Sequence, residues 1–369
     1  MRHSNYYLCL TAVVLPKTKV LKPPRQLLVL CFSPLGDSAM CVPVLRALFM
    51  AHPKLTLTVL GRPNARALFE EFDRVQFFAV EFKGKHKGVK GLWRLYVELK
   101  TIPHQAIADL IAAWHTHMLR FFYLGTTKRF VQLNKGQKEK QALIRTKNKI
   151  LRPLPHTVYR YAAVFQKLGI AVDPATAETP ETPELPKGLP EALEHSTKKW
   201  IGIAPFASSE GKTYPLDLMQ QVVAYLQKEY QVLLFGEGHL EEKQFTVWEK
   251  AYPNVTATSA TLALKAQLDL IAQLDVMIAM DDAYGHFAAN AGIPVLTLWG
   301  LTHPYLGTAP FGASLNCNLV ADREKFPGIP IALKGSSIPP GYEAAFRTIT
   351  PKAVLEKVLE IVQETVSSG

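Results

Sequence analysis

The sequence predicts an α/β protein made of two doubly wound parallel-sheet halves that face each other across a cleft. Short apolar runs of strand length alternate with amphipathic helical patterns, which is typical of parallel sheets. The pattern stops at a segment rich in proline and acidic residues and then starts again. The chain has 369 residues, which is enough for two domains of ordinary size.

The first half opens with a continuous apolar strand, as expected for a strand covered on both faces. A glycine-containing turn, 34–37, follows it and leads into an amphipathic helix. The expected strands are 26–32, 55–60, 75–80 and 106–110, and the expected helices are 40–49, 65–72, 91–99 and 153–168. Together these elements predict a first domain over 26–170, and residues 1–25 are expected to form a poorly ordered extension.

Residues 171–199 form a linker by composition, because proline and acidic residues crowd together there. The alternation then resumes. The expected strands are 200–204, 231–235, 276–280 and 295–299, and the expected helices are 216–230, 240–252, 264–274, 283–291 and 351–366. The sequence therefore predicts a second domain over 200–350 and a terminal helix within 351–369. Ligands of open α/β sheets bind at the carboxyl ends of the strands, so the cleft is the expected site.

The composition excludes several classes of protein. Hydrophobic residues make up 48% and charged residues 20%, which excludes a mostly disordered chain, a collagen and a coiled coil. A formal net charge of +11 favours anionic partners, namely nucleic acid, a membrane surface or a phosphorylated substrate, although solubility alone would also explain it. Four scattered cysteines are too few for a disulfide scaffold or a zinc cluster, and a reducing cytoplasm fits them.

No apolar stretch approaches the length of a spanning helix. The longest N-terminal run, Tyr6 to Leu15, is closed by Pro16 and Lys17 and lacks a small-residue cleavage site. We therefore expect neither a signal peptide nor a transmembrane segment, and we expect the protein in the cytoplasm.

Asp37 follows the first buried strand, in the turn that opens a helix. Taken alone, the position favours a helix N-cap, since a carboxylate there accepts backbone N–H bonds. The alternative is a general base at the mouth of the cleft, which would take a proton from an acceptor hydroxyl. Spacing does not decide between these two roles.

Two loops of the second half carry groups suited to phosphate. The loop 204–215 has small residues, hydroxyls and Lys212, but not the spacing of a Walker loop. Taken alone, Lys212 is either a phosphate-binding charge or a solvated loop lysine. The segment 280–286 ends a strand and begins a helix, so one of its two aspartates is expected to cap that helix. A metal-binding aspartate pair is disfavoured, because no further carboxylates cluster nearby. His286 and the N–H groups of the helix start either face a diphosphate, or His286 is a buried structural histidine.

Two further features each allow two interpretations. The turn 235–242 resembles a nucleotide-binding turn weakly, and Glu241 there either holds ribose hydroxyls or lies in solvent. Basic runs lie at 83–90, 135–140 and 145–149. These runs are either a solvated face or an electrostatic funnel for a phosphorylated acceptor or an anionic membrane. Nucleic acid is disfavoured, because no nucleic-acid-binding module accompanies the charge.

These pieces, in this order, resemble glycosyltransferase family nine, the ADP-heptose:lipopolysaccharide heptosyltransferases. The resemblance rests on Phe32-Ser-Pro-Leu-Gly-Asp-Ser-Ala-Met, Val42-Pro-Val-Leu-Arg-Ala-Leu48, Lys212-Thr-Tyr-Pro215, Asp281-Asp-Ala-Tyr-Gly-His286 and Trp299-Gly-Leu-Thr-His-Pro304. It implies the GT-B fold, with two Rossmann-like domains, and an inverting reaction that uses no metal and no cofactor. The co-substrate it implies is a nucleotide sugar, ADP-heptose, and the acceptor is a phosphorylated glycolipid of the lipopolysaccharide core.

By this resemblance Asp37 is the catalytic base and Lys212 meets the donor phosphates. The resemblance also implies a set of donor-binding residues, which are Ala207, Ser208, Glu241, Leu262, Asp281, Asp282, Ala283, Tyr284 and His286. Acceptor contacts are expected at Lys83, Lys85 and Lys87. The basic runs predict a peripheral protein that binds the inner face of the membrane at low salt and leaves it as salt rises.

The chain departs from the family pattern in two places that keep alternatives open. The segment 109–115 lacks the family's Asp-Leu-His motif, and Asp282 adds a negative charge beside the expected diphosphate. A non-catalytic binding protein that kept the fold is therefore one alternative. Another GT-B enzyme, such as a nucleotide-sugar epimerase, is the other.

Overall fold

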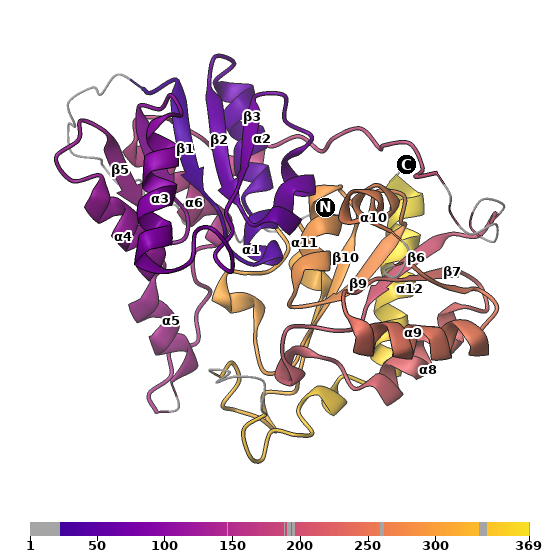
Figure 1. The fold of residues 1–369 in the computed structure, drawn as a ribbon. Coiled ribbons are helices and arrows are strands. Elements are labelled where there is room, and N and C mark those ends of the chain that lie inside the picture. Colours follow the sequence, from indigo (N-terminus) through magenta and orange to yellow (C-terminus); the bar gives the residue numbers. More distant parts are fainter. Residues whose placement is uncertain are drawn as a thin grey trace.

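The structure of the protein, a computed structural model, describes residues 23–145, 147–187, 189, 193, 196–258, 262–331 and 338–368. Two all-parallel sheets form its framework, one from each half of the chain, as the sequence predicts (Figure 1). Residues 1–22 of the expected N-terminal extension lie outside the described residues, as do parts of the expected linker. The domain boundaries drawn from the sequence stay a prediction.

The first sheet has the strand order β3-β2-β1-β4-β5. Its central strand is the predicted apolar run, and Leu27 to Leu30 are almost fully buried. The strands are β1 (Gln26–Leu30), β2 (Thr56–Gly61), β3 (Val75–Ala79), β4 (Ala106–Asp109) and β5 (Arg129–Gln132). The helices are α1 (Leu35–Ala39), α2 (Val42–Ala51), α3 (Gly88–Lys100), α4 (Trp114–Phe122), α5 (Gln137–Ile144) and α6 (Thr157–Lys167).

The second sheet has the order β11-β10-β9-β6-β7-β8, so its switch point lies between β6 and β9. The strands are β6 (Trp200–Ala204), β7 (Gln231–Leu234), β8 (Val255–Ala257), β9 (Val276–Met280), β10 (Val295–Trp299) and β11 (Asn318–Val320). The helices are α8 (Leu216–Leu226), α9 (His239–Ala251), α10 (Leu264–Ile271), α11 (Ala283–Asn290) and α12 (Pro351–Ser368). Short 3₁₀ turns connect several of these elements.

Some predicted elements are wrong in type or extent. The helix expected at 65–72 is a 3₁₀ helix, η1 (Pro63–Phe69), and the helix expected at 153–168 begins only at Thr157. Pro153 and Pro155 cannot donate helical hydrogen bonds, and the His156 side chain caps the helix by accepting from the backbone N–H of Val158. The sequence patterns missed α1, α4, α5, β5, β8 and β11, because these elements are short or only partly buried.

Helices α1 and α11 pack against each other where the two halves meet (Figure 1). One hydrophobic cluster runs through this contact, from Leu27 and Val29 of β1 to Tyr284 and Phe287 of α11. A second face of the first sheet is covered by α3 and α4, which pack on Leu28. The α1–α11 contact therefore joins the halves through a continuous apolar core rather than through the linker alone.

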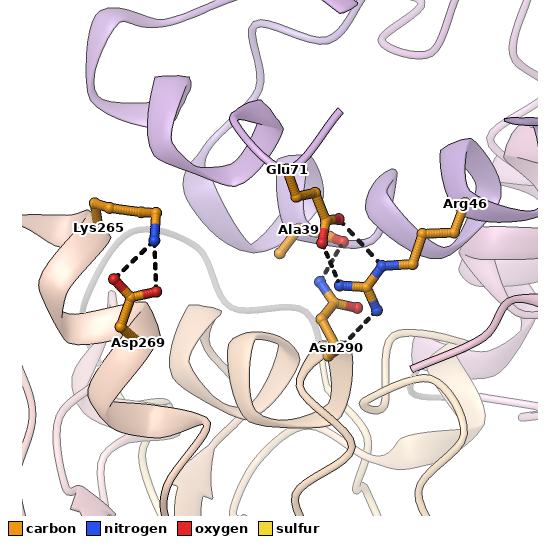
Figure 2. Close-up of polar contacts among 6 residues, drawn as sticks. All are labelled: Ala39, Arg46, Glu71, Lys265, Asp269 and Asn290. Carbon is orange, nitrogen blue, oxygen red and sulfur yellow. Dashed lines mark hydrogen bonds and ion pairs between the residues drawn. The ribbon is translucent and has the colours of Figure 1, made fainter. Parts of the chain in front are cut away.

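A polar clamp lies beside this core (Figure 2). Arg46 of α2 donates to the Glu71 carboxylate at 3.1 and 2.8 Å and also to the backbone carbonyl of Asn290 in α11. The Asn290 amide in turn donates to the backbone carbonyl of Ala39 in α1 at 3.0 Å. Arg46 is mostly buried, at 14% side-chain exposure, so its hydrogen bonds are shielded from water.

We expect Arg46→Ala to lower the free energy of unfolding by about 1.5–3 kcal/mol. The variant loses the charge-assisted hydrogen bonds to Glu71 within the first half and the one to the Asn290 carbonyl that links the halves. The matched control is Lys265→Ala, which breaks an exposed ion pair with Asp269 within α10 (Figure 2). That change is expected to cost less than about 0.5 kcal/mol. Chemical denaturation followed by circular dichroism measures both, and equal losses would contradict the proposed clamp.

Candidate active site

A cavity of about 540 Å³ lies between the halves, beside the α1–α11 contact. Loops from the carboxyl ends of β1, β2, β6, β7 and β9 line it, as expected for the crevice of doubly wound sheets. Ten residues predicted from the sequence line this cavity: Asp37, Ala207, Ser208, Lys212, Glu241, Asp281, Asp282, Ala283, Tyr284 and His286. The volume is in the range of small-molecule sites in proteins.

Asp37 is the third residue of α1 and is exposed to the cavity. The N-cap of this helix is Pro34, which has no side-chain acceptor, so the interpretation of Asp37 as the cap is wrong. Burial by the cavity walls raises the pKa of the Asp37 carboxyl above its ordinary value. The positive charges of Lys140, Lys135 and Lys212 oppose this rise, and Asp281 adds to it. The carboxylate is thereby made a better proton acceptor.

Lys212 approaches the same cavity from the loop after β6. Its Nζ lies 2.8 Å from Oδ2 of Asp281, at the end of β9. The pair is partly shielded, since the side chains are 25% and 9% exposed. Lys212 is therefore positioned by a carboxylate while its charge still faces the cavity, where an anionic ligand would share it.

Asp282 is the N-cap of α11, which confirms that one of the two aspartates caps this helix. Its carboxylate accepts from the backbone N–H of Ala283 at 2.6 Å and from that of Ser208 at 3.0 Å. Asp282 thus ties the β6 loop to the start of α11. It also occupies the N–H group of Ala283, one of those expected from the sequence to face a diphosphate.

His286 lies in the second turn of α11 and is almost fully buried, at 6% exposure. Burial, helped by the charges of His156 and Lys212 and opposed by Asp281, lowers the pKa of its imidazole to about 4. The imidazole is therefore neutral at pH 7. A neutral ring on the cavity wall can donate or accept one hydrogen bond without adding charge.

Acidic side chains line another part of the cavity wall. Glu241 accepts from the backbone N–H of Glu237 at 2.6 Å, and both residues line the cavity. Burial, together with the negative charges of Asp282 and Glu237, raises the pKa of Glu241 to about 7, although the hydrogen bond from the Glu237 N–H opposes this rise. Carboxyl groups at this position can form hydrogen bonds with the hydroxyl groups of a ligand.

Leu262 is not among the residues that line the cavity. It lies behind the wall, because its carbonyl accepts from the Gln267 amide at 3.0 Å, and Gln267 accepts in turn from the hydroxyl of Tyr284. Lys83, Lys85 and Lys87 also lie outside the lining. Of the basic runs, only the later one acts on Asp37, through Lys135 and Lys140, alongside Lys212.

Four polar residues of the lining were not predicted from the sequence: Arg62, Asn64, Glu237 and Thr308. Arg62 follows β2 and donates to the Phe32 carbonyl at 3.1 Å, and Glu237 follows β7. Both positions are at carboxyl ends of strands, a signal that could have found them. Thr308 comes from the loop after the 3₁₀ turn η4 (Pro304–Leu306), which no pattern marks.

The described residues contain no group of three or more His, Cys, Asp or Glu side chains arranged to hold a metal ion. Nor does that part of the chain include a helix long and apolar enough to cross a membrane. The chemistry that the lining itself offers is a carboxylate from one half, facing a cation and a neutral imidazole from the other.

A family model for glycosyltransferase family 9 (heptosyltransferase) matches residues 116–329, which is more than half of the chain. A search of curated proteins finds no match.

Solved structures share the fold. A family 9 glycosyltransferase from Veillonella parvula is 16% identical, with a TM-score of 0.68 over 92% of this chain and 98% of that one. The Escherichia coli ADP-heptose lipopolysaccharide heptosyltransferase II is 18% identical, with a TM-score of 0.63 over 92% and 99%. The Escherichia coli heptosyltransferase WaaC with ADP-2-deoxy-2-fluoro heptose is 14% identical, with a TM-score of 0.61 over 91% and 99%. The two facing parallel sheets are thus the predicted GT-B fold.

We expect Glu241→Gln to flatten the pH dependence of stability. In the folded state Glu241 keeps its proton up to about pH 7, whereas the unfolded chain releases it near the ordinary value of 4.5. The wild type therefore loses stability as the pH rises between these values. Across pH 5, 6, 7 and 8, the melting temperature of the variant should increase relative to that of the wild type. A constant difference, matching that of the exposed control Glu178→Gln, would contradict the raised pKa.

Proposed function

The chain belongs to glycosyltransferase family 9, the heptosyltransferases, and on that premise we propose that it transfers a heptose from ADP-heptose to a glycolipid acceptor. The observation that carries this proposal is the shared cavity. A carboxylate with a raised pKa, Asp37, comes from one half, and Lys212 and a neutral His286 come from the other. Such a cavity holds a base and a phosphate-binding charge within reach of one ligand.

The proposed reaction inverts the anomeric centre and needs no metal. Asp37 accepts the proton of an acceptor hydroxyl as its oxygen attacks the anomeric carbon of the donor sugar. The bond from that carbon to the donor phosphate oxygen breaks, and the electron pair leaves with the nucleoside diphosphate. Lys212 balances the charge that develops on the leaving group.

Both the relatives and the cavity support the proposed donor. WaaC has been solved with ADP-2-deoxy-2-fluoro heptose, and another heptosyltransferase, TibC, has been solved in complex with ADP-D-beta-D-heptose. In this chain Glu237 and Glu241 offer carboxyl groups suited to ribose hydroxyls, and Lys212 faces the position proposed for the diphosphate.

The acceptor is proposed to be a phosphorylated saccharide on a lipid, such as the lipopolysaccharide core. Support comes from the positive charges that act on Asp37 from α5 and from the loop before it, Lys140 and Lys135. An acceptor phosphate held by these lysines would bring a neighbouring hydroxyl toward the base. Such an acceptor would place the enzyme at the inner face of a cytoplasmic membrane.

We expect Asp37→Asn to reduce turnover by roughly 10²–10⁴-fold while donor binding survives, since the amide cannot take the proton. Release of ADP from ADP-heptose with a core-oligosaccharide acceptor measures the rate, and calorimetry measures donor binding. Asp73→Asn, an exposed carboxylate outside the cavity lining, is the control and should keep full activity. Full activity of Asp37→Asn would refute the base. Donor binding by a wild type that never turns over would favour the non-catalytic binding protein.

Lys212→Gln is expected to lower kcat by roughly 10²–10³-fold, because the leaving diphosphate loses its balancing charge. Lys212→Arg keeps the charge and should recover part of this loss. Steady-state kinetics with varied donor concentration separates the effect on kcat from that on KM. If both variants lose activity equally, the charge of Lys212 is not what the reaction uses. Product formed from the donor without any acceptor would instead indicate an epimerase.

A further inference from the structure

The outer helices of the first half expose an unusual number of large apolar side chains. One face of the first sheet contributes to the apolar core that continues into α11. Helices α3 and α4 cover the opposite face of this sheet (Figure 1). Six apolar residues on and just after them are between 48% and 66% exposed: Val89, Trp93, Val97, Trp114, Phe121 and Leu124. Scattered apolar residues are normal on a protein surface, whereas a cluster of this kind marks an interaction site.

These six residues, here called the aromatic patch, lie on and just after two helices that pack against each other. Val89, Trp93 and Val97 follow each other at intervals of four, so they lie along one stripe of α3. Trp114 and Phe121 lie two helical turns apart on α4. The two helices touch through the rings of Trp93 and Phe122, whose centroids are 5.2 Å apart.

Positive charge surrounds the aromatic patch. The stretch from Lys83 to Lys128 holds eight basic residues and two acidic ones. Of the two acids, Asp109 is fully buried, and Glu98 lies 3.2 Å from His86 and 3.8 Å from Lys85. The basic residues are Lys83, Lys85, Lys87, Lys90, Arg94, Lys100, Arg120 and Lys128. A partner for this face must therefore be negatively charged and must also accept apolar side chains.

A second copy of this chain does not meet that requirement, since two such faces would repel each other. Single-stranded nucleic acid would stack on the tryptophans, but it offers nothing to Val89, Val97 and Leu124. An anionic bilayer fits both parts of the surface. Its headgroups attract lysine and arginine, and tryptophan, phenylalanine and leucine enter the boundary between headgroups and acyl chains.

A chain of contacts connects Trp114 of the aromatic patch to the cavity lining. Trp114 contacts His115 with ring centroids 4.0 Å apart, and His115 contacts Phe82 at 4.5 Å. Phe82 packs on Phe32 at 4.8 Å, and the Phe32 carbonyl accepts from Arg62, which lines the cavity. A protein resting on this surface would thus hold one side of its cavity close to the lipid.

We propose that the aromatic patch inserts into the interface of an anionic membrane, with the basic residues around it binding lipid headgroups. This inference rests on the proposed function only for the claim that the docked cavity receives a lipid-anchored acceptor. The basic runs, which look alike in the sequence, then have different roles. The run at 83–90 borders the aromatic patch, whereas Lys135 and Lys140 act on Asp37, and Lys149 donates to the carbonyls of Gly328, at 2.6 Å, and of Pro330.

Vesicle binding of the full chain tests the proposal. The probes are vesicles of phosphatidylcholine alone and vesicles in which about a third of the lipid is phosphatidylglycerol, which supplies the anionic headgroups. We expect binding to the anionic vesicles at low salt. Phe121→Ser with Leu124→Ser should weaken it by about tenfold or more at every salt concentration, since apolar burial is not screened. Leu240→Ser with Val247→Ser removes apolar side chains of similar exposure from α9 and should bind like the wild type.

Tryptophan fluorescence gives a readout specific to this surface. Trp200, Trp248 and Trp299 are buried, so the exposed tryptophans are Trp93 and Trp114 of the aromatic patch. Their emission should shift to shorter wavelength on anionic vesicles and become protected from acrylamide. Lys87→Glu with Lys90→Glu should remove the salt-dependent part of the binding. That variant keeps the apolar residues, so it separates the two contributions.

Four results would overturn the proposal. They are equal binding to neutral and anionic vesicles, unchanged binding by the Phe121/Leu124 variant, dimerisation through this face, or binding to a single-stranded oligonucleotide in preference to vesicles. Turnover with a de-acylated core oligosaccharide tests the proposed function separately. If vesicle binding depends on the aromatic patch but the oligosaccharide is not turned over, the proposed function is refuted and the docking surface is supported.

Discussion

The close packing of α1 against α11 is the constraint on which the candidate active site depends. Gly36 lies at the contact, and a Cβ atom there would be 3.5 Å from both Ala283 Cα and His286 Cδ2. A methyl group would therefore fill the remaining space, and a longer side chain would push the helices apart. Because α1 carries Asp37 and α11 begins just after Asp281 and Asp282, this contact brings the proposed base and the proposed donor site to one cavity.

The electrostatics of the cavity differ from those of the whole chain. The chain has a net charge of +11, yet several carboxyl groups line the cavity, and burial together with the charges of Asp282 and Glu237 raises the pKa of Glu241. Lys212 is paired with Asp281, and the carboxylate of Asp282 is satisfied by backbone N–H groups. Fixed charges that already have partners cost little reorganisation when a ligand arrives. Much of the excess positive charge lies instead on the outer surface of the first half and near Asp37.

Most of the site could be predicted because it follows a topological rule. Asp37, Lys212 and Asp281 all lie just beyond the carboxyl ends of parallel strands, and such ends meet at one edge of each sheet. The rule does not predict which way a side chain points or the residue at which a helix begins. Leu262 lies behind the wall, and whether Asp37 caps its helix depended on where α1 begins, which a shift of a few residues decides.

The sequence by itself determined the alternation of buried strands and amphipathic helices, since burial on both faces requires continuous apolar runs such as Leu27 to Leu30. It also determined that the chain is divided into two such halves. Only the tertiary structure decided the strand orders, the α1–α11 contact and the meeting of α3 and α4 that creates the aromatic patch. The physical reason is that the sequence pattern is local, whereas packing joins segments far apart in the chain. Periodicity reports which face of a segment is apolar, whereas the partner of that face is chosen by packing among segments far apart in the chain.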